Sequence, residues 1–373
     1  MRIETIAVHA GRKPDPATGA VTQPIHLSTT FEREPDGEYP KGYVYARSNN
    51  PNREALEKCL AELEDGKSCA VFSSGSAGTM SVLQSLSAGD YIIASDDLYH
   101  GTRRLMKLFE KWGLRTTFVD MTNLKSFSNS FGKKTKLVWV ETPSNPLLKI
   151  IDLEKISEIA HKTKAVVLCD NTWATPILQR PFAFDADLIL HATTKYIGGH
   201  SDILGGAVIA KEESELMESV KEIQKSGGAV PSPFECWLVL RGIQTLPLRV
   251  RAQSESALQI AEFLNGHGSV NRVYYPGLPT HPGHPLASVQ MRQFGGMVSF
   301  EVKGGKENAM KAASNVKLFT RATSLGGPES LIEHRASVEG PDSKTPQNLL
   351  RLSIGLENPG DLIEDLGQAL GAF

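Results

Sequence analysis

Short apolar runs alternate with helix-like segments from about residue 52 to residue 210, and this alternation constrains the fold more than any other feature. NREALEKCLAELEDG has apolar residues at helical spacing, and CAVFSSGSAGTMSVLQSLSAGD is typical of a strand, a turn and a helix. Strand-like runs follow, mostly separated by segments long enough for crossovers: YIIAS, RTTFVD, LVWVETP, AVVLCD, LILHA and AVIA. This order predicts an α/β fold, with a mostly parallel sheet and helices on both faces.

The two ends of the chain differ from this middle region. Residues 1–44 are rich in Pro, Gly and Thr and have little periodicity, so they predict an extended arm that needs a surface to lie on. A long helical stretch begins near Ser232 and continues past Pro247, and GGMVSFEV, LLRLSIGLE and DLIEDLGQAL then predict two strands and a closing helix. We expect an arm at 1–44, a main domain at 45–241 and a smaller α/β domain at 242–373.

Composition and charge argue against several classes of partner. The formal net charge is -2 and no polybasic run is present, so we expect no nucleic-acid partner. The four cysteines have no CxxC spacing, which indicates neither a disulfide framework nor a zinc site. The N-terminus is charged and no run of about 18 apolar residues occurs, so we expect a cytoplasmic protein without a membrane anchor.

Polar side chains stand where several predicted strands end. AVVLCD ends at Asp170, LVWVE ends at Glu141 with Asn145 beyond it, YIIAS leads to Tyr99, and LILHATTK leads to Lys195. In a parallel sheet the carboxyl ends of the strands share one edge, where ligands bind. We therefore expect these side chains to meet there.

Each of these residues also has an ordinary structural explanation. A lysine after a strand is usually solvated, an aspartate there is often a helix cap, and a tyrosine is more often a packing residue. The turn SSGSAGT at residues 73–79 opens a helix and also presents backbone N–H groups to an anion. Together they supply an anion site, a ring platform, a carboxylate and an amine, which are the requirements of pyridoxal phosphate. That cofactor would occupy Lys195 as a Schiff base.

The whole chain resembles a known family, the Cys/Met-metabolism or trans-sulfuration enzymes, which are pyridoxal-phosphate proteins of the aspartate-aminotransferase-like fold (fold type I). The segments that carry the resemblance are YARSNNPNR, SSGSAGT, DDLYHGT, ETPSNP, DNTWATP, TKYIGGHSD, SLGGPESL and RLSIGLE. The resemblance is to the cystathionine γ-lyase and cystathionine γ-synthase type. It implies an enzyme with a small amino-acid substrate.

The resemblance also implies roles for individual residues. The cofactor-binding set is Tyr45, Arg47, Gly75, Ser76, Tyr99, Asn145, Asp170, Thr172, Thr194 and Lys195. Within it, Lys195 carries the cofactor and transfers protons, Asp170 pairs with the pyridine nitrogen, and Tyr99 stacks on the ring and acts as an acid or base. Tyr45 and Arg47 reach the phosphate of a neighbouring subunit, which implies an active-site dimer, usually paired into a tetramer. The substrate-binding set is Arg351 and Ser324 at the α-carboxylate, with Arg104 and Glu333 toward the distal end.

Departures from the family pattern leave the exact reaction open. Ala192 replaces the usual serine, His100 replaces the usual glycine, Val44 replaces an acidic residue, and RASVEGP replaces PAxMTH. Gly101 stands where methionine γ-lyases usually have cysteine. We expect γ-lyase or γ-synthase activity, with cystathionine β-lyase, methionine γ-lyase and O-acylhomoserine sulfhydrylase as alternatives.

Three other classes remain as rivals to a trans-sulfuration enzyme. A metal hydrolase would recruit His191, His200 and Asp202, although their spacing fits no familiar ligand pattern and we expect no metal. A non-catalytic homologue would not need Lys195, Asp170, Tyr99 and Arg351 together. An aminotransferase would share the cofactor but release a new amino acid.

Overall fold

The computed structural model describes residues 1–339 and 344–371, and a seven-stranded sheet is the centre of the molecule. Its strand order is β1-β7-β6-β5-β4-β2-β3. The strands are β1 (Ser68–Phe72), β2 (Tyr91–Ser95), β3 (Arg115–Val119), β4 (Thr135–Glu141), β5 (Val166–Asp170), β6 (Leu188–His191) and β7 (Gly206–Ala210). Only β7 runs against its neighbours, and the other paired strands are parallel. The predicted α/β fold class, with a mostly parallel sheet, is confirmed.

Both faces of this sheet are buried, which explains why its strands are nearly continuous apolar runs. Alternate residues of a strand point to opposite faces. Leu137 and Trp139 of β4 pack in the core with α3 (Gly75–Gln84), α4 (His100–Phe109) and α8 (Glu215–Gly227). Val138 and Val140 belong to the core on the other face, with α2 (Pro51–Glu64) and α6 (Leu153–His161).

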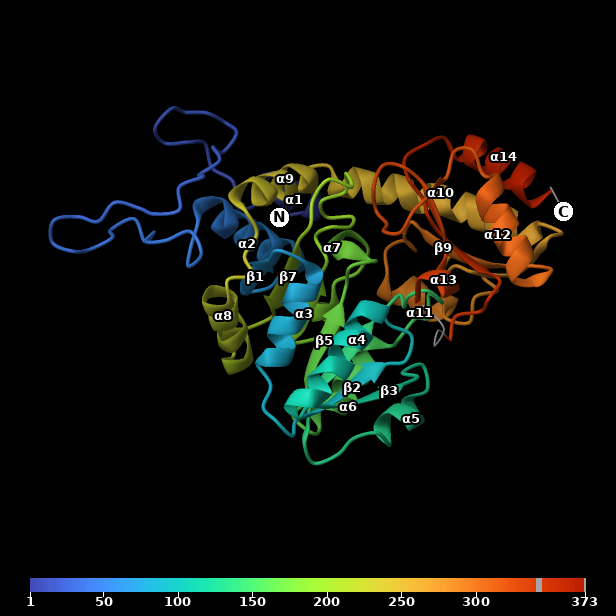
Figure 1. The fold of residues 1–373 in the computed structure, drawn as a ribbon, viewed down its shortest axis with the longest axis horizontal. Helices are drawn as coiled ribbons and strands as arrows, with labels where there is room; N and C mark the ends of the chain where they lie inside the picture. The colour runs from blue at the N-terminus through green and yellow to red at the C-terminus, as the bar shows by residue number, and fades with distance from the viewer. Residues whose placement is uncertain (340–343, 372–373) are drawn as a thin grey trace.

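A second sheet of five strands lies toward the C-terminus, in the order β10-β11-β12-β9-β8. Its strands are β8 (Val270–Tyr274), β9 (Met297–Val302), β10 (Thr320–Arg321), β11 (Leu331–His334) and β12 (Leu349–Ser353). Helices α10 (Leu246–Gly266) and α12 (Gly305–Asn315) pack against it, and α14 (Pro359–Leu370) packs against these two helices (Figure 1). The strands and closing helix expected there are present, while the domain boundaries at 44/45 and 241/242 stay a prediction.

The long helix expected from Ser232 is interrupted. It forms as α9 (Pro233–Ile243) and α10, separated by Gln244 and Thr245. Pro247 has no backbone N–H to donate to the carbonyl of Ile243, and its ring crowds that carbonyl. The helix therefore ends and restarts at this point.

The N-terminal arm is only partly as expected. Residues 3–9 form the helix α1 (Ile3–His9), whose buried Ile3, Ile6 and Ala7 pack against α2 and α10. The helical pattern of apolar residues covers only these few positions. The expectation of an extended arm is therefore wrong for this segment. The next forty residues contain no helix and only the isolated bridge between Thr30 and Tyr45, and they project away from the body of the molecule (Figure 1).

Short elements complete the chain. They are η1 (Glu110–Trp112), α5 (Leu124–Ser128), α7 (Thr175–Leu178), η2 (Pro181–Phe184), α11 (His284–Gln290) and α13 (Arg335–Glu339). Across residues 1–339 and 344–371, no helix has both the length and the apolar character needed to cross a membrane.

Candidate active site

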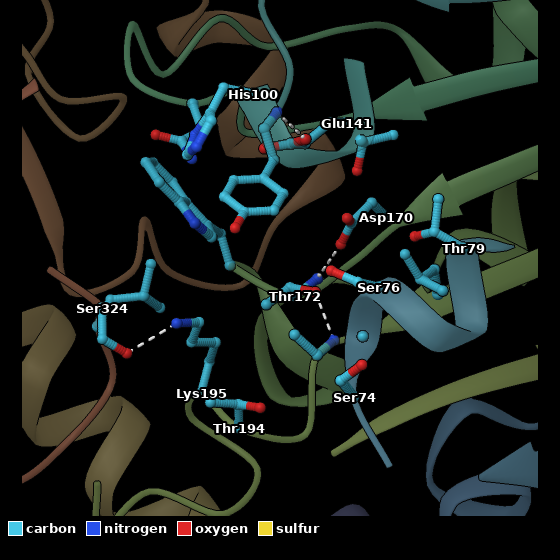
Figure 2. Close-up of a pocket in the computed structure, with 18 of the residues that line it drawn as sticks. Ser74, Ser76, Thr79, His100, Glu141, Asp170, Thr172, Thr194, Lys195 and Ser324 are labelled. Atoms are coloured by element: carbon cyan, nitrogen blue, oxygen red, sulfur yellow. Dashed lines mark hydrogen bonds between the residues drawn. The ribbon is translucent and has the colours of Figure 1, made fainter. Parts of the chain in front are cut away.

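A cavity of about 210 Å³ lies at the carboxyl ends of the parallel strands (Figure 2). It brings together ten of the predicted site residues: Gly75, Ser76, Tyr99, Asn145, Asp170, Thr172, Thr194, Lys195, Ser324 and Arg351. The first eight come from the main sheet and its helices, and the last two come from the C-terminal region. The structure therefore closes the predicted edge of the sheet into a pocket.

Two carboxylates stand side by side at this edge. Glu141 and Asp170 are paired in register on β4 and β5, and both are buried. Burial raises the pKa of Asp170, and burial together with the neighbouring Asp170 charge raises the pKa of Glu141. Asp170 Oδ1 accepts a hydrogen bond from the Thr172 backbone N–H at 3.1 Å, and no ion pair to Asp170 is formed by the described residues. Asp170 thus has room for a cationic donor within the cavity.

Lys195 is held inside the pocket without a carboxylate partner. Its Nζ donates to the Ser324 hydroxyl at 2.7 Å, as the dashed line in Figure 2 shows. Burial and the nearby Arg351 charge lower the pKa of Lys195 to about 8. Ser324 has φ of 92°, a backbone conformation that non-glycine residues rarely adopt and that is often found at functional sites. About half of the amine is therefore neutral at pH 8, where it can act as a nucleophile or base.

Tyr99 is held by its backbone and by the glycine that follows two residues later. Its N–H donates to Glu141 Oε2 at 2.7 Å, which gives the buried Glu141 a positioning contact. A Cβ atom at Gly101 would collide with the Tyr99 ring. Tyr99 as a whole is 41% exposed and lines the cavity, so its ring can serve as a platform for a planar ligand.

The amino end of α3 borders the cavity. The helix begins at Gly75, and the Ser74 side chain caps it by accepting from the Ala77 N–H at 3.1 Å. A Cβ atom at Gly75 would lie 3.0 Å from that of Ala192, so the turn and the start of the Lys195 loop are closely packed. Free N–H groups at a helix start attract phosphate. The Thr194 hydroxyl instead exchanges hydrogen bonds with the backbone of Gly205, at 3.2 and 3.0 Å.

Arg351 forms the opposite wall of the pocket. Its guanidinium donates to Asn145 Oδ1 at 3.0 Å and to Glu333 Oε2 at 2.8 Å. Glu333 Oε2 also accepts from Arg335 at 2.7 Å, so one carboxylate serves two buried guanidiniums. Burial lowers the pKa of Arg351 to about 10, which still leaves it cationic at neutral pH.

Four predicted site residues do not line the cavity of their own chain. Glu333 lies behind Arg351, and Arg104 is exposed on α4. Tyr45 and Arg47 lie on the projecting arm, where Arg47 donates to the Lys225 carbonyl at 2.5 Å. Contact of the first two with a distal substrate group, and of the last two with a neighbouring subunit, stay predictions.

The cavity also contains residues to which the sequence analysis assigned no role, among them Trp173, Thr323 and Arg335. The guanidinium of Arg351 lies 5.8 Å from the centroid of the Trp173 ring. Arg335 is the first residue of RASVEGP, so the departure from the family pattern at that point was a usable signal. A fully buried arginine is rare enough to mark a site when its position is known.

The metal alternative finds no support in the geometry. His191 Nε2 contacts Glu64 Oε1 at 2.6 Å in the core, whereas His200 Nδ1 contacts the Gly198 carbonyl at 2.9 Å. Within the part of the chain that the structure describes, no three His, Cys, Asp or Glu side chains are grouped to hold a metal ion.

The residues of the pocket fit pyridoxal phosphate. The buried Asp170 carboxylate suits a protonated ring nitrogen, the start of α3 suits the phosphate, and Lys195 suits the aldehyde carbon. Ala192 has no hydroxyl and that of Thr194 already pairs with Gly205, so the backbone N–H groups at the start of α3 and the Ser76 hydroxyl are the donors that would hold a phosphate.

Comparison with known proteins agrees with this fit. Residues 4–371 match the family described as Cys/Met metabolism PLP-dependent enzyme. The chain belongs to this family. It is a pyridoxal-phosphate-dependent trans-sulfuration enzyme, as the resemblance implied.

Individual members of the Cys/Met metabolism family are similar along their whole length. Cystathionine γ-synthase of Mycobacterium leprae is 48% identical over 375 residues, covering 99% of this chain and 96% of the relative. Cystathionine β-lyase of Coxiella burnetii is 44% identical over 380 residues, covering 99% and 97%. The crystal structure of metB from Corynebacterium glutamicum superposes with a TM-score of 0.97 at 42% identity, covering 100% of this chain and 98% of the other.

Proposed function

We propose that this enzyme acts at the γ-carbon of cystathionine or of an activated homoserine, as a cystathionine γ-synthase or γ-lyase. The observation that carries the proposal is the partly buried Lys195 amine, which has no carboxylate partner and shares its cavity with the buried Arg351. A substrate amino acid fits this pair, because its α-carboxylate pairs with the guanidinium while its Cα faces the amine. The similarity to a protein named cystathionine γ-synthase supports this choice.

The residues around Arg351 and Lys195 have distinct tasks in this proposal. Arg351 binds the α-carboxylate with its two-pronged guanidinium, and Asn145 and Glu333 hold that guanidinium in place. Pyridoxal phosphate, when bound, supplies an electron-withdrawing ring that makes protons at Cα and Cβ removable. Lys195, with a pKa of about 8, is suited to take a proton from Cα and to move protons between carbons.

Two further residues complete the machinery. Asp170 keeps the ring nitrogen of the cofactor protonated, because a buried carboxylate without another cation stabilises a positive charge beside it. Tyr99 covers the ring, and its hydroxyl is placed to exchange a proton with the substrate amine or the departing group. We propose these roles for Lys195, Asp170, Tyr99, Arg351 and the other predicted site residues together.

The products decide between the reactions. Incubation with cystathionine alone gives cysteine, 2-oxobutanoate and ammonia if the enzyme is a γ-lyase. Incubation with acyl-homoserine and cysteine gives cystathionine if it is a γ-synthase. Pyruvate, homocysteine and ammonia from cystathionine would overturn the γ-carbon proposal in favour of β-lyase, the second candidate, whose name the Coxiella burnetii relative carries.

We propose further that the enzyme works as a homodimer that pairs into a tetramer in the cytoplasm. Tyr45 and Arg47 are exposed on the projecting arm. This exposure supports the proposal that the arm contacts a second copy of the chain. The four cysteines are free and buried, which suits a reducing compartment. Sedimentation velocity of the cofactor-loaded enzyme tests the assembly, and a monomer would exclude it.

A further inference from the structure

His100 is a pocket residue to which no task has yet been given. It is the first residue of α4, directly after Tyr99, and it lines the same cavity as Lys195 and Arg351. Figure 2 shows it at the end of the pocket away from Lys195 and Ser324. A ligand whose reactive carbon lies at Lys195 would therefore extend its distal part toward His100.

The imidazole of His100 is packed on one side and unused as a hydrogen-bonding group. Its ring meets the Tyr99 ring edge-on, with centroids 4.8 Å apart and an interplanar angle of 65°. The Nδ1 atom is buried without a hydrogen-bond partner, and the residues that the structure describes make no hydrogen bond to Nε2 either. A half-buried imidazole with no protein partner is free to bind a ligand.

The surroundings keep this imidazole neutral near pH 7. Burial is the main cause that lowers the pKa of His100, and the charges of Arg335 and Arg104 act in the same direction. Glu339 and Glu333 oppose this effect but do not reverse it. Its place at the first turn of a helix also disfavours a positive charge. A neutral imidazole offers one donor and one acceptor, whereas an imidazolium offers only donors.

We propose that His100 is a specificity-determining residue that hydrogen-bonds the polar distal group exchanged at the γ-carbon of the substrate. This inference rests on the proposed function and deepens it. The amine and carboxylate of cystathionine, or the ester of an acyl-homoserine, carry hydrogen-bonding atoms at the distal end. The S-methyl group of methionine carries no donor there, so His100 favours the first class of substrate over the second.

The test uses three variants of the cofactor-loaded enzyme. His100→Phe keeps a ring beside Tyr99 but removes both nitrogens, and His100→Gln keeps a hydrogen-bonding group without the ring. Lys107→Ala, on the exposed part of α4 and outside the cavity, is the matched control. For each, kcat/KM is measured with cystathionine, with acyl-homoserine plus cysteine, and with methionine.

We expect His100→Phe to lower kcat/KM for the polar substrates about tenfold to a hundredfold while leaving that for methionine within about twofold. His100→Gln should recover part of the loss, and Lys107→Ala should match the unmodified enzyme. The deciding quantity is kcat/KM for a polar substrate divided by kcat/KM for methionine. If this ratio is the same in the unmodified enzyme and in His100→Phe, the inference is overturned. If the unmodified enzyme converts none of the γ-substrates, the proposed function fails instead, whatever the variants do.

A binding measurement separates specificity from damage to the fold. Cystathionine is titrated calorimetrically into cofactor-loaded Lys195→Ala protein and into the same protein with His100→Phe. The inference requires about tenfold weaker binding in the second protein with unchanged absorbance of the bound cofactor. Equal dissociation constants would contradict it, as would a loss explained by release of cofactor.

Discussion

The pocket and the N-terminal arm both carry predicted site residues, but the chain treats them differently. Lys195, Asp170 and Arg351 lie in one buried cavity and are held by hydrogen bonds within this chain. Tyr45 and Arg47 are exposed on a segment with almost no regular structure (Figure 1), where Arg47 contacts the body through the Lys225 carbonyl. Strand ends anchored in a two-faced sheet form a pocket by themselves, whereas the arm has no core of its own, and we propose that a second copy supplies the surface on which it lies.

The largest effect is expected at the centre of the pocket. Lys195→Ala removes the amine that holds the cofactor and moves protons, so kcat should fall by about 10²- to 10⁴-fold or more. Lys211→Ala, which removes a lysine paired with Asp185 outside the cavity, is the control and should leave kcat unchanged. Product formation is followed by chromatography, and retention of turnover by Lys195→Ala would exclude the role of this amine.

A second effect is expected at the wall of the pocket. Arg351→Lys keeps a positive charge but loses the two-pronged geometry and one of the contacts to Asn145 and Glu333. We expect kcat/KM to fall roughly 30- to 150-fold, mainly through a higher KM. This corresponds to a loss of about 2–3 kcal/mol of binding free energy. Arg272→Lys, at an exposed arginine over the Tyr274 ring, should change kcat/KM little. An unchanged KM in Arg351→Lys would mean that the α-carboxylate binds elsewhere.

The arm is tested through cofactor retention. Arg47→Ala should weaken binding of pyridoxal phosphate about tenfold, because one guanidinium leaves the phosphate of the neighbouring subunit. Lys41→Ala, at another exposed position of the arm, is its control. Dialysis followed by absorbance of the remaining cofactor gives the affinity.

Mixing two variants shows whether the arm serves its own pocket or that of a partner. Arg47→Ala and Lys195→Ala chains, refolded together, form about a quarter of complete sites if the arm reaches across a dimer. Such sites retain cofactor as tightly as the unmodified enzyme. If no complete sites appear on mixing, the arm either contacts the pocket of its own chain or contacts no pocket at all.

The smallest effect concerns pH. With the pKa of Lys195 lowered to about 8 by burial and by Arg351, the amine is protonated below that pH and neutral above it. Cofactor-free protein should therefore take up pyridoxal phosphate about fivefold faster at pH 8 than at pH 7, and less than about twofold faster again at pH 9. Stopped-flow absorbance measures the rate. A rise that continues to pH 10 would mean that the amine has the ordinary pKa of a lysine.

The apolar patterns gave the strands of the main sheet because each strand is buried on both faces. Asp170 and Glu141 could be placed at strand ends for the same reason, since each directly follows an apolar run. The reversed direction of β7 was not predictable, because pairing with β1 joins segments distant in the sequence and leaves no local signal. The helix α1 was missed because seven residues give too short a periodic pattern.

Contacts between side chains in the pocket were also only partly predictable from the sequence. Motif resemblance identified Lys195, Tyr99 and Arg351, whose neighbours in sequence are distinctive. Arg335 reaches the cavity only through the folding of the C-terminal sheet, and its two ion pairs, with Glu333 and Glu339, appear only in three dimensions. The sequence predicts that Glu333 faces the substrate. In the structure its carboxylate binds two arginines, and the spacing of these residues in the sequence does not reveal that contact.

The central claim is that the amine of Lys195 carries pyridoxal phosphate. Borohydride reduction of the purified enzyme, followed by proteolysis and mass spectrometry, measures this directly. We expect a single phosphopyridoxyl adduct on the peptide that contains residue 195. An adduct on another lysine, or none in an enzyme that turns over substrate, would contradict the account.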